Sequence, residues 1–453
     1  MAKNMVSKQK KRAQWAWYLY DFGNSAYAAV VLLAVYAAYF KDGVVGGAKG
    51  SLLWGISLFI AGLVVSIISP ILGAMADYSG RKKMFLFIMT AISTVFTGLL
   101  FFVEKGNVFL GMLLFIIAEI GYRGGQTFYN GLLTDIADED EIAKVSGNGW
   151  AVGSAGGIIC LIIVLAMIML NPGNTLIVRF SLVFTAVYFI IFALPAFLWI
   201  KEEPNPQEKG GESYFQIAFD RIKTTLRSVK NFKEFIKFMV SLLIYNDGII
   251  AALDFASIIG LVLFGMTSES MIIFVIIVQF TNMIGAYVYG RASEKTGIKK
   301  SLVESLVLMI VAVVGMMFIQ TTTAFYIVGA LAGYAMAGVQ MLSRTMVSVF
   351  APEGKSAEFY GFFSLTGRTS SIIGPLVMGA SATGISTWVM NSLVKSGVAG
   401  VGDANALVIS EQIGHRIAMI TIIFFLLVGL MPLLFVNEEE GRKAAKAASI
   451  VNK

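Results

Sequence analysis

Eight ionisable side chains lie inside long apolar stretches of the sequence. Each costs a few kcal/mol or more at the depth of a lipid bilayer, so such residues mark functional sites by default. Carboxylates there could bind an ammonium group or carry a proton or another cation, and guanidinium groups could bind an anionic ligand. The eight residues are Asp21, Glu119, Arg123, Asp247, Asp254, Glu304, Arg344 and Arg368.

The first apolar stretch places three polar side chains on one face of a helix. Asp21, Asn24 and Ser25 recur at i, i+3 and i+4, a spacing that aligns them along the same side. We expect Asp21 to bind a substrate ammonium group or a coupling cation, with Asn24 and Ser25 beside it. The alternative is a buried carboxylate that pairs with an arginine or with backbone N–H groups.

Two further carboxylates lie on the seventh apolar stretch. Asp247 and Asp254 are seven residues apart, so both face the same side of a helix. We expect them to take part in proton or cation coupling, and we expect Asn246 to contribute to substrate binding. The alternative for Asp247 is a structural bond to a neighbouring helix.

Opposite charges meet in the fourth stretch, where Glu119 and Arg123 have i, i+4 spacing. They form either a structural pair or a site in which Arg123 moves between Glu119 and a substrate carboxylate. In the second case, protonation of Glu119 would supply coupling. Arg368, in the eleventh stretch, has no acidic residue within one helical turn, so it needs a partner across the bundle or an anionic ligand.

Taken together, these groups match a zwitterion. An amino acid carries an ammonium group for Asp21 or Asp247, and a carboxylate for Arg123 or Arg368. Amides such as that of Gln340 would bind the remaining polar atoms. A sugar, a peptide or a lysolipid head group would also meet charges and amides, so the substrate stays open.

The composition indicates a membrane protein. Of 453 residues, 57% are hydrophobic and 14% are charged, whereas soluble domains carry about 25% charged residues. This excludes a soluble enzyme, a disordered chain and a disulfide scaffold. A single cysteine and a single histidine exclude a cysteine-based metal cluster, and no phosphate-binding loop has the required glycine spacing. We therefore expect no metal, no cofactor and no enzymatic activity.

Hydropathy windows of about 19 residues predict twelve membrane-spanning helices. If the N-terminus is cytoplasmic, 26 of the 35 lysines and arginines fall in inside segments. The excess of positive charge inside places both termini in the cytoplasm and explains the net charge of +7 without a nucleic-acid partner. The predicted spans are 15–40, 52–76, 84–103, 108–134, 147–170, 179–200, 235–265, 269–290, 301–320, 325–350, 357–385 and 414–436.

An internal repeat divides the chain into two halves. Residues 73–83 (GAMADYSGRKK) and 290–300 (GRASEKTGIKK) align at an offset of 217, each after the second span of six. At this offset Lys82 and Lys83 match Lys299 and Lys300, and at an offset of 214 Gly153 matches Gly367. We predict two pseudo-symmetric six-helix halves, 15–200 and 235–436. Cytoplasmic ends 1–14 and 437–453 flank them, and a linker with an amphipathic helix, 201–234, joins them.

The repeated loops are expected to act as gates. Asp77 can pair with basic groups at a helix end, Gly80 turns the chain, and the basic residues after it hold the loop on the cytoplasmic side. Arg344, near the cytoplasmic end of the tenth span, is expected to be a gate or latch residue. The predicted gating residues are Gly73, Asp77, Gly80, Arg81, Lys82, Glu294 and Arg344.

The pattern G-x-x-x-D-x-x-G-R-K-K after the second span resembles the loop signature of the major facilitator superfamily. Further motifs resemble its vacuolar amino-acid effluxer-like branch, named for an autophagy-related effluxer. They are YDFGNSAYA (20–28), YNDG (245–248), GVQMLSRT (338–345), and APEGKSAEFYGF (351–362) with GP at 374–375. The resemblance implies the twelve-helix major facilitator fold, alternating access and a latching role for the loop. The fifth span, GNGWAVGSAGG (147–157), resembles an antiporter motif but lacks its Gly-Pro pair.

These observations predict a secondary active transporter of a small polar solute. We expect an amino acid as substrate, with a proton or sodium ion as coupling ion and proton coupling favoured. The alternatives are a cation-coupled sugar or (lyso)lipid carrier, and a membrane receptor or scaffold without transport. We expect the protein in the lipid bilayer of a bacterial inner membrane, where this architecture can work as a monomer.

Overall fold

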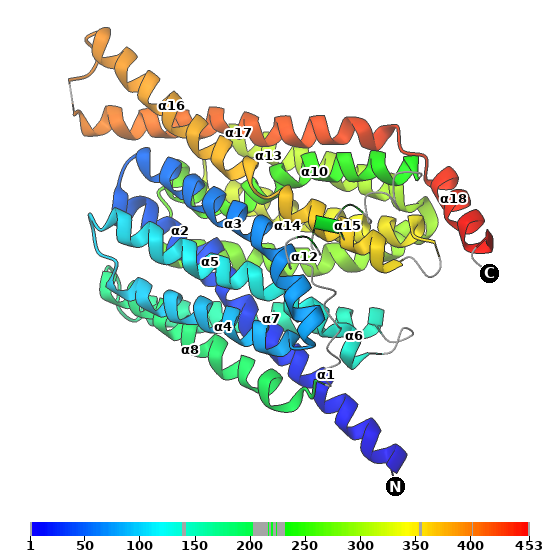
Figure 1. Ribbon diagram of the computed structural model, residues 1–453. Helices are drawn as coiled ribbons and strands as arrows, with labels where there is room; N and C mark the ends of the chain where they lie inside the picture. Colours follow the sequence, from blue (N-terminus) through cyan, green and yellow to red (C-terminus); the bar gives the residue numbers. More distant parts are fainter. Residues whose placement is uncertain are drawn as a thin grey trace. The chain divides into compact units, whose positions relative to one another are not determined.

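The computed structural model of the chain describes residues 2–137, 142–202, 232–352, 356–400 and 402–451, with Gln216, Phe219, Asp220 and Lys223. Within this part the ordered elements are helices, and twelve of them are long and apolar enough to cross a membrane (Figure 1). The prediction of an all-α membrane protein with twelve spans is confirmed. The amphipathic helix predicted for the linker falls outside the described residues, apart from the four isolated positions.

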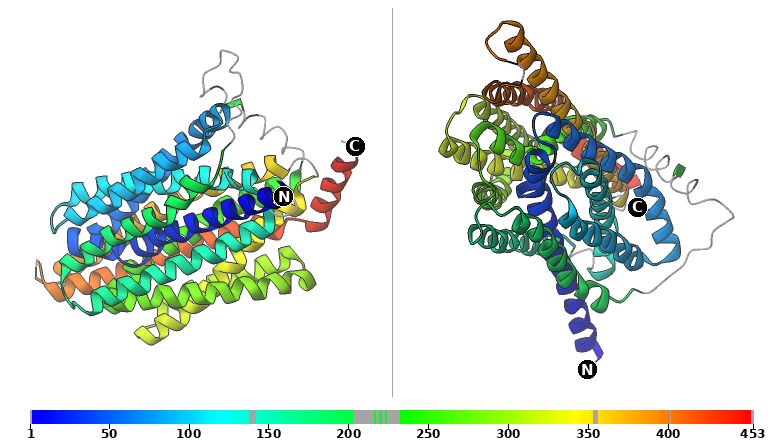
Figure 2. Two further views of the ribbon diagram at one scale, coloured as in Figure 1. Left: turned by 90° about the horizontal axis from the view of Figure 1, so that it is seen from below. Right: turned by 90° about the vertical axis from the view of Figure 1, so that its left-hand side faces the viewer.

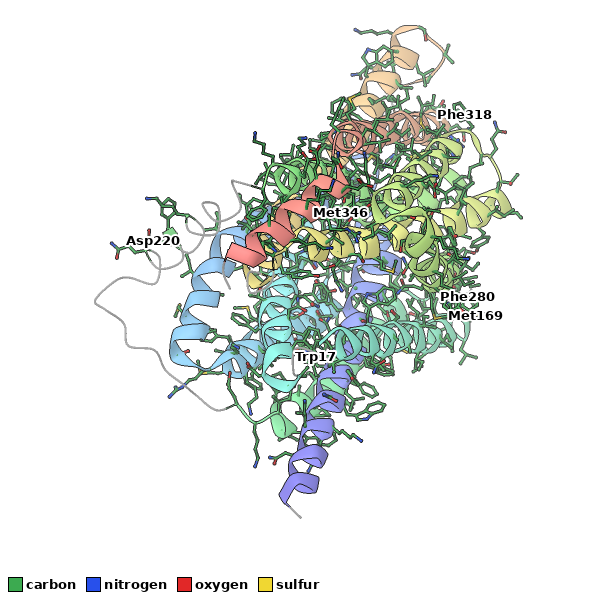
Figure 3. The ribbon with its side chains drawn as sticks, turned by 90° about the vertical axis from the view of Figure 1, so that its right-hand side faces the viewer. Trp17, Met169, Asp220, Phe280, Phe318 and Met346 are labelled. Atoms are coloured by element: carbon green, nitrogen blue, oxygen red, sulfur yellow. The ribbon has the colours of Figure 1, made fainter. Side chains whose placement is uncertain are left out.

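The twelve apolar helices carry large hydrophobic side chains on their outer surfaces. Met169, Phe280 and Phe318 are examples, each more than half exposed (Figure 3). Such exposure suits helices that contact hydrocarbon in place of water. The spans are Gln9–Val45, Lys49–Gly73, Lys82–Phe102, Val108–Gly131, Asn148–Met169, Thr175–Trp199, Lys233–Asp254, Ser268–Ser293, Ile298–Phe318, Thr322–Phe350, Ile373–Lys395 and Ala404–Leu434.

Contacts between helices divide the chain into two compact units. The first unit comprises Met1–Gly46 and Leu63–Phe219, and the second comprises Gly47–Gly62 and Asp220–Lys453. Several spans begin at a polar side chain that bonds an amide of the first turn: Asn174, Thr267, Thr321 and Asp403. These caps bond amides that have no partner within the helix.

In the first unit, α1 packs against α7 and α8, and α4 packs against α5 and α8. The N-terminal turns of α1 project beyond these neighbours (Figure 2). Glycines of α7 allow α1 to approach closely, since a Cβ atom at Gly156 would overlap the backbone of Phe22. The elements are α1 (Ala2–Tyr27), η1 (Ala28–Ala34), α2 (Tyr36–Ala38), η2 (Tyr39–Val45), α3 (Lys49–Ser79), α4 (Lys82–Leu99), η3 (Leu100–Phe102), α5 (Val108–Gly131), α6 (Leu133–Ile136), α7 (Ile142–Met169) and α8 (Thr175–Trp199).

In the second unit, α17 packs against α16 and α10, and α14 packs against α12 and α13. Small residues again permit the contact, since a Cβ atom at Gly429 of α17 would overlap Tyr245 of α10. The elements are α10 (Lys233–Asp254), α11 (Ala256–Phe264), α12 (Ser268–Thr296), α13 (Ile298–Phe318), α14 (Thr322–Phe350), α15 (Ser356–Thr369), α16 (Ile373–Lys395), α17 (Ala404–Leu434) and α18 (Glu438–Val451).

The second unit also includes the first turns of α3. A Cβ atom at Gly55 would overlap the carbonyl oxygen of Pro375 on α16, so only a glycine allows this approach. The indole Nε1 of Trp54 donates to the carbonyl oxygen of Asp254 at 2.9 Å. Asp254 is the last residue of α10, so its carbonyl lies where the seventh span is interrupted and accepts a bond from another helix.

Candidate functional site

The polar face of the first span lies against α7. Asn24 Nδ2 donates to Asp21 Oδ1 at 3.5 Å, and the Asn24 side chain is buried. Gly153 of α7 faces the same carboxylate, and a Cβ atom there would overlap Asp21 and crowd the hydroxyl of Ser25. The structure therefore brings Asp21, Asn24 and Ser25 together at a helix contact where Gly153 leaves room for the carboxylate.

The Asp21 carboxylate has few hydrogen-bond donors. Among the described residues, the long contact from Asn24 is the one hydrogen bond that it accepts. No ion pair of the described residues involves Asp21. A carboxylate in this setting is costly at bilayer depth unless it binds a proton or a cation. The geometry of Asp21 therefore suits ligand or proton binding.

The second polar group of the first unit is an ion pair on α5. Arg123 Nε donates to Glu119 Oε1, as their spacing indicates, and Glu119 is fully buried while 20% of the Arg123 side chain is exposed. Within the described part of the chain, the second carboxylate oxygen of Glu119 is buried without a hydrogen-bond partner, and so is the hydroxyl of Tyr27. Buried polar atoms without partners are rare and indicate a site for a ligand, water or proton.

Tyrosines surround these carboxylates. Tyr27 stacks on Tyr122 with ring centroids 4.5 Å apart, and Tyr20 stacks on Tyr129 at 5.0 Å. Trp17 (Figure 3) stacks on Tyr129 at 4.3 Å, and its indole donates to the Tyr129 carbonyl oxygen at 2.9 Å. Sequence analysis did not single out Tyr122 and Tyr129. Their spacing of seven residues could have indicated a shared role, because it places both tyrosines on one face of α5.

In the second unit, three consecutive residues of α10 form hydrogen bonds with three different residues. The Tyr245 hydroxyl lies 2.6 Å from Ser343 Oγ of α14. Asn246 Nδ2 donates to Ser370 Oγ at 2.7 Å, and the backbone amide of Gly374 donates to Asp247 Oδ1 at 2.8 Å. The polar side chains of this motif are therefore engaged by protein partners.

The remaining predicted site residues lie apart from this cluster or outside the description. Asp254 is buried at the end of α10. Gln340 and Arg344 are exposed, four residues apart on α14, and the Arg344 carbonyl accepts a 3.5 Å bond from Tyr360. Arg368 is the penultimate residue of α15. The side chains of Asp77, Glu294 and Arg368 lie outside the described residues.

The predicted gating loops form turns and polar contacts. Gly80 and Gly297 have φ angles of +63° and +90°, which favour glycine. Lys82 Nζ bonds Asp135 of α6 at 3.0 Å, while Arg81 is exposed. Among the described residues, nothing lies within 4 Å of a Cβ atom placed at Gly73.

In each unit, a lysine at the start of the third span forms hydrogen bonds with the segment at the end of the sixth span. The amide of Lys83 donates to Glu202 at 3.2 Å, and its ammonium group donates to a carbonyl oxygen after α8. The amide of Lys299 likewise donates to Glu438 at 2.9 Å, and its ammonium group donates to a carbonyl at the end of α17. Lys83 thus makes the contacts that Lys299 makes, one residue further along than in the alignment, while the turn glycines Gly80 and Gly297 match as aligned.

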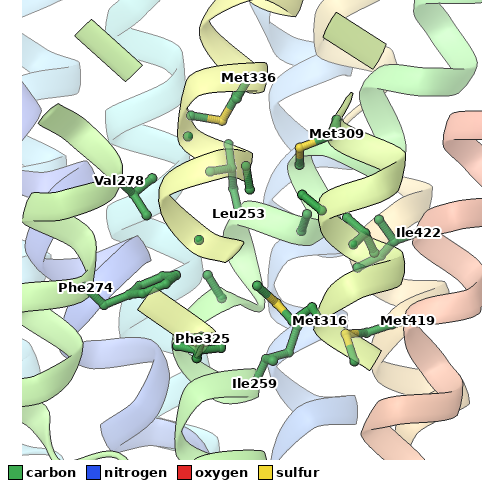
Figure 4. A pocket seen from close by; sticks show the side chains of 17 residues that line it. Leu253, Ile259, Phe274, Val278, Met309, Met316, Phe325, Met336, Met419 and Ile422 are labelled. Atoms are coloured by element: carbon green, nitrogen blue, oxygen red, sulfur yellow. The ribbon is translucent and has the colours of Figure 1, made fainter. Parts of the chain in front are cut away.

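An apolar cavity of about 60 Å³ lies inside the second unit, among α10 to α14 and α17 (Figure 4). Its wall consists of small and aliphatic residues together with methionine and phenylalanine side chains, including Met309, Met336, Met419, Phe274 and Phe325. None of the predicted site residues lines it. A wall without polar groups cannot hold ordered water, so this cavity is dry and suits apolar groups.

Comparison with known proteins identifies the family. The sequence pattern of the family described as "Vacuole effluxer Atg22 like" matches residues 52–383, most of the chain. The uncharacterized MFS-type transporter YxiO of Bacillus subtilis is 28% identical over 414 residues, which cover 87% of this chain and 95% of that protein. Autophagy-related protein 22 of Yarrowia lipolytica is 24% identical over 268 residues, which cover 52% of this chain and 45% of that protein.

Solved structures share the fold. A bacterial homologue of the human lysosomal transporter Spinster, inward-facing and unoccupied, superimposes with a TM-score of 0.71 at 14% identity, covering 97% of this chain and 98% of that chain. A variant of the nucleoside transporter NupG gives 0.69 at 13% identity, covering 94% and 99%. The predicted major facilitator fold is confirmed, and the relatives are membrane transporters of this kind. The chain is therefore a membrane transporter of the major facilitator kind and belongs to the vacuole effluxer Atg22-like family.

Proposed function

We propose that the chain is a secondary active transporter that moves amino acids by alternating access, with transport coupled to protons. The polar groups of the first unit support this substrate class. Asp21, with Asn24 and Ser25 beside it, suits a substrate ammonium group, and the partly exposed Arg123 suits a substrate carboxylate. Within the second unit, Gln340, Asn246 and Arg368 are proposed as further substrate-binding residues.

One observation carries the coupling proposal. The Asp21 carboxylate lies against Gly153 at bilayer depth, and its one described hydrogen bond is the 3.5 Å contact from Asn24. A carboxylate held in this way binds a proton or a cation more readily than one that several donors satisfy. We assign proton binding to Asp21, with Glu119 as the second buried carboxylate of the unit.

The test is transport by the purified full chain in proteoliposomes. Labelled amino acids are supplied in pools, first for counterflow against matched unlabelled solute and then for accumulation driven by a pH gradient. Asp21→Asn is compared with the wild-type chain. Asp403→Asn is the matched control, because Asp403 is an exposed helix cap and asparagine caps a helix as well as aspartate.

We expect protein-dependent counterflow in the wild-type chain and in Asp403→Asn, and weaker counterflow in Asp21→Asn, because Asp21 is also proposed to bind the substrate ammonium group. Asp21→Asn should lose pH-driven accumulation by about tenfold or more, equivalent to about 1.4 kcal/mol of coupling, while Asp403→Asn keeps it. Equal accumulation in Asp21→Asn and wild type would contradict the coupling assignment. Absence of counterflow for every amino-acid pool, with folded wild-type protein, would contradict the substrate class.

A second candidate is a carrier for a solute with an apolar part, such as a lysolipid. The dry cavity of the second unit favours it, because methionine-rich walls adapt to apolar groups. The cavity volume of about 60 Å³ is well below the roughly 150 Å³ of an apolar cavity that binds benzene, so as it stands the cavity is too small for an acyl chain. Amino acids therefore remain the leading proposal, and inhibition of counterflow by a lysolipid would favour the second one.

We also propose that both termini lie on the cytoplasmic side of a bacterial inner membrane. The distribution of lysine and arginine between the predicted loops supports this orientation. A protease added to the outside of intact cells should leave both termini uncut. Cleavage of either terminus under these conditions would contradict the orientation.

A further inference from the structure

The eleventh span is interrupted. α15 ends at Thr369 and α16 begins at Ile373, so residues 370–372 are not helical. Ile372 precedes α16 and has no polar side chain to bond the free amides of the first turn. Backbone polar groups without partners cost several kcal/mol each in a membrane interior, so another element must bond them.

The seventh span bonds both sides of this interruption. Asp247 Oδ1 accepts the amide of Gly374, in the first turn of α16, at 2.8 Å. Asn246 Nδ2 donates to the hydroxyl of Ser370 at 2.7 Å, and that hydroxyl donates to the Gly367 carbonyl at 3.1 Å. Two consecutive residues of α10 thus bond one helix start and one helix end.

Packing differs on the two sides of the interruption. A Cβ atom at Gly374 would overlap the Asp247 carbonyl oxygen, so α16 touches the backbone of α10 at this point. On α15, Phe359 packs on Phe235 of α10 with ring centroids 4.5 Å apart, while a Cβ atom at Gly361 or Gly367 would meet nothing within 4 Å among the described residues. Hinges are short segments, often at the ends of helices, that absorb large changes of φ and ψ. The start of α16 touches the backbone of α10, whereas this contact of α15 with α10 is between side chains.

We propose that Asp247 and Asn246 are positioning residues that hold the interruption of the eleventh span as a hinge for α15. Asp247 caps α16 and keeps it on α10, while Asn246 holds Ser370 at the end of α15. Arg368 lies two residues before the hinge, in the last turn of α15, so its backbone moves with α15. In this arrangement Asp247 accepts a hydrogen bond for structural reasons, and it is not the residue that carries the coupling proton.

Hydrogen–deuterium exchange of the full chain tests the hinge without any substrate. Asp247→Ala removes the acceptor, and loss of a cap is worth about 1 kcal/mol, so we expect exchange of the Gly374 amide to rise by about fivefold or more. Asp247→Asn retains an acceptor oxygen and should exchange like wild type. Asp403→Ala is the matched control, since it removes the cap of α17 and should affect only residues 405–406.

Transport is the second measurement, and it rests on the proposed function. Asp247→Ala should reduce both counterflow and pH-driven accumulation, while Asp247→Asn should restore both together. If Asp247→Ala does not fold, Ser370→Ala is used in its place. This variant removes the hydroxyl that accepts the hydrogen bond from Asn246, and it changes only a small side chain. Faster exchange across 370–374 is then expected.

Two results would overturn the proposal. One is exchange at Gly374 that is equally fast in Asp247→Asn and Asp247→Ala, or unchanged in both. The other is an Asp247→Asn chain with slow exchange and normal counterflow that has lost pH-driven accumulation, which would make Asp247 the proton carrier. If the wild-type chain transports no amino acid, the proposed function fails, while the exchange result still decides the hinge.

Discussion

Asp21 and Asp247 hold related places in the two units. Each lies on the first span of its unit, and each lies against a glycine on the fifth span of that unit, Gly153 or Gly374. Gly374 is in the first turn of α16, so its amide is free to bond Asp247 at 2.8 Å. Gly153 lies inside the continuous helix α7, where amides bond the helix itself. This contrast supports our proposals that Asp247 has a structural role and that Asp21 binds a ligand or a proton.

The same contrast extends beyond the two aspartates. Among the described residues, seven buried side-chain atoms of the first unit lack a hydrogen-bond partner. The second unit instead contains the dry, methionine-lined cavity. The seven atoms belong to Tyr27, Ser69, Ser93, Glu119, Thr127, Tyr129 and Arg179. This difference favours polar recognition in the first unit and packing or hinge roles in the second.

Removing Arg123 should have the largest effect on stability. Arg123→Met leaves the fully buried Glu119 without its ion-pair partner, and breaking a buried pair on one side costs about 3–5 kcal/mol. The double variant Glu119→Gln/Arg123→Met should recover part of this loss, because no uncompensated charge remains. Reversible unfolding in mixed micelles measures both free energies. If Arg123→Met leaves the free energy of unfolding unchanged, the ion pair does not distinguish the first unit from the second.

Replacing glycine by alanine should have different effects on stability at Gly153 and Gly367, the two glycines that the sequence repeat aligns. Gly153→Ala places a Cβ atom on the Asp21 carboxylate, and overpacking costs about 1–3 kcal/mol. Gly367→Ala meets open space and should be neutral or stabilising by up to about 1 kcal/mol, from helix propensity. Thermal unfolding and pH-driven uptake are measured for both. Equal effects would contradict a special packing requirement at Asp21.

The two units should respond alike where both form a neutral tyrosine hydrogen bond. Tyr20 bonds Thr90 at 2.8 Å and Tyr245 bonds Ser343 at 2.6 Å. Both partner hydroxyls also bond a carbonyl oxygen of their own helix, so neither is left without a partner. Tyr20→Phe and Tyr245→Phe should each destabilise the chain by about 0.5–1.5 kcal/mol. The same unfolding assay measures both losses. A loss well above this range in one variant would indicate that its tyrosine has a role beyond this hydrogen bond.

Sequence patterns predicted the elements well and their interruptions poorly. Twelve spans follow from long apolar runs, and the common face of Asp21, Asn24 and Ser25 follows from helical period. The eleventh span was predicted as continuous over 357–385, whereas the structure interrupts it at 370–372. Gly374 and Pro375 indicate a possible break in the helix. They do not indicate whether a distant residue accepts hydrogen bonds from the amides at the start of the next helix.

The sequence by itself determined the fold class, the number of spans, the internal repeat and the family, because each depends on hydrophobicity or motif order along the chain. Tertiary structure alone decided which aspartate is capped, which side chain Gly153 faces and where Gly47–Gly62 packs. These outcomes depend on contacts between residues more than one hundred positions apart, such as Asp247 with Gly374 and Trp54 with Asp254. Period and composition describe one helix at a time, whereas a buried polar group is satisfied or left open by the helix beside it.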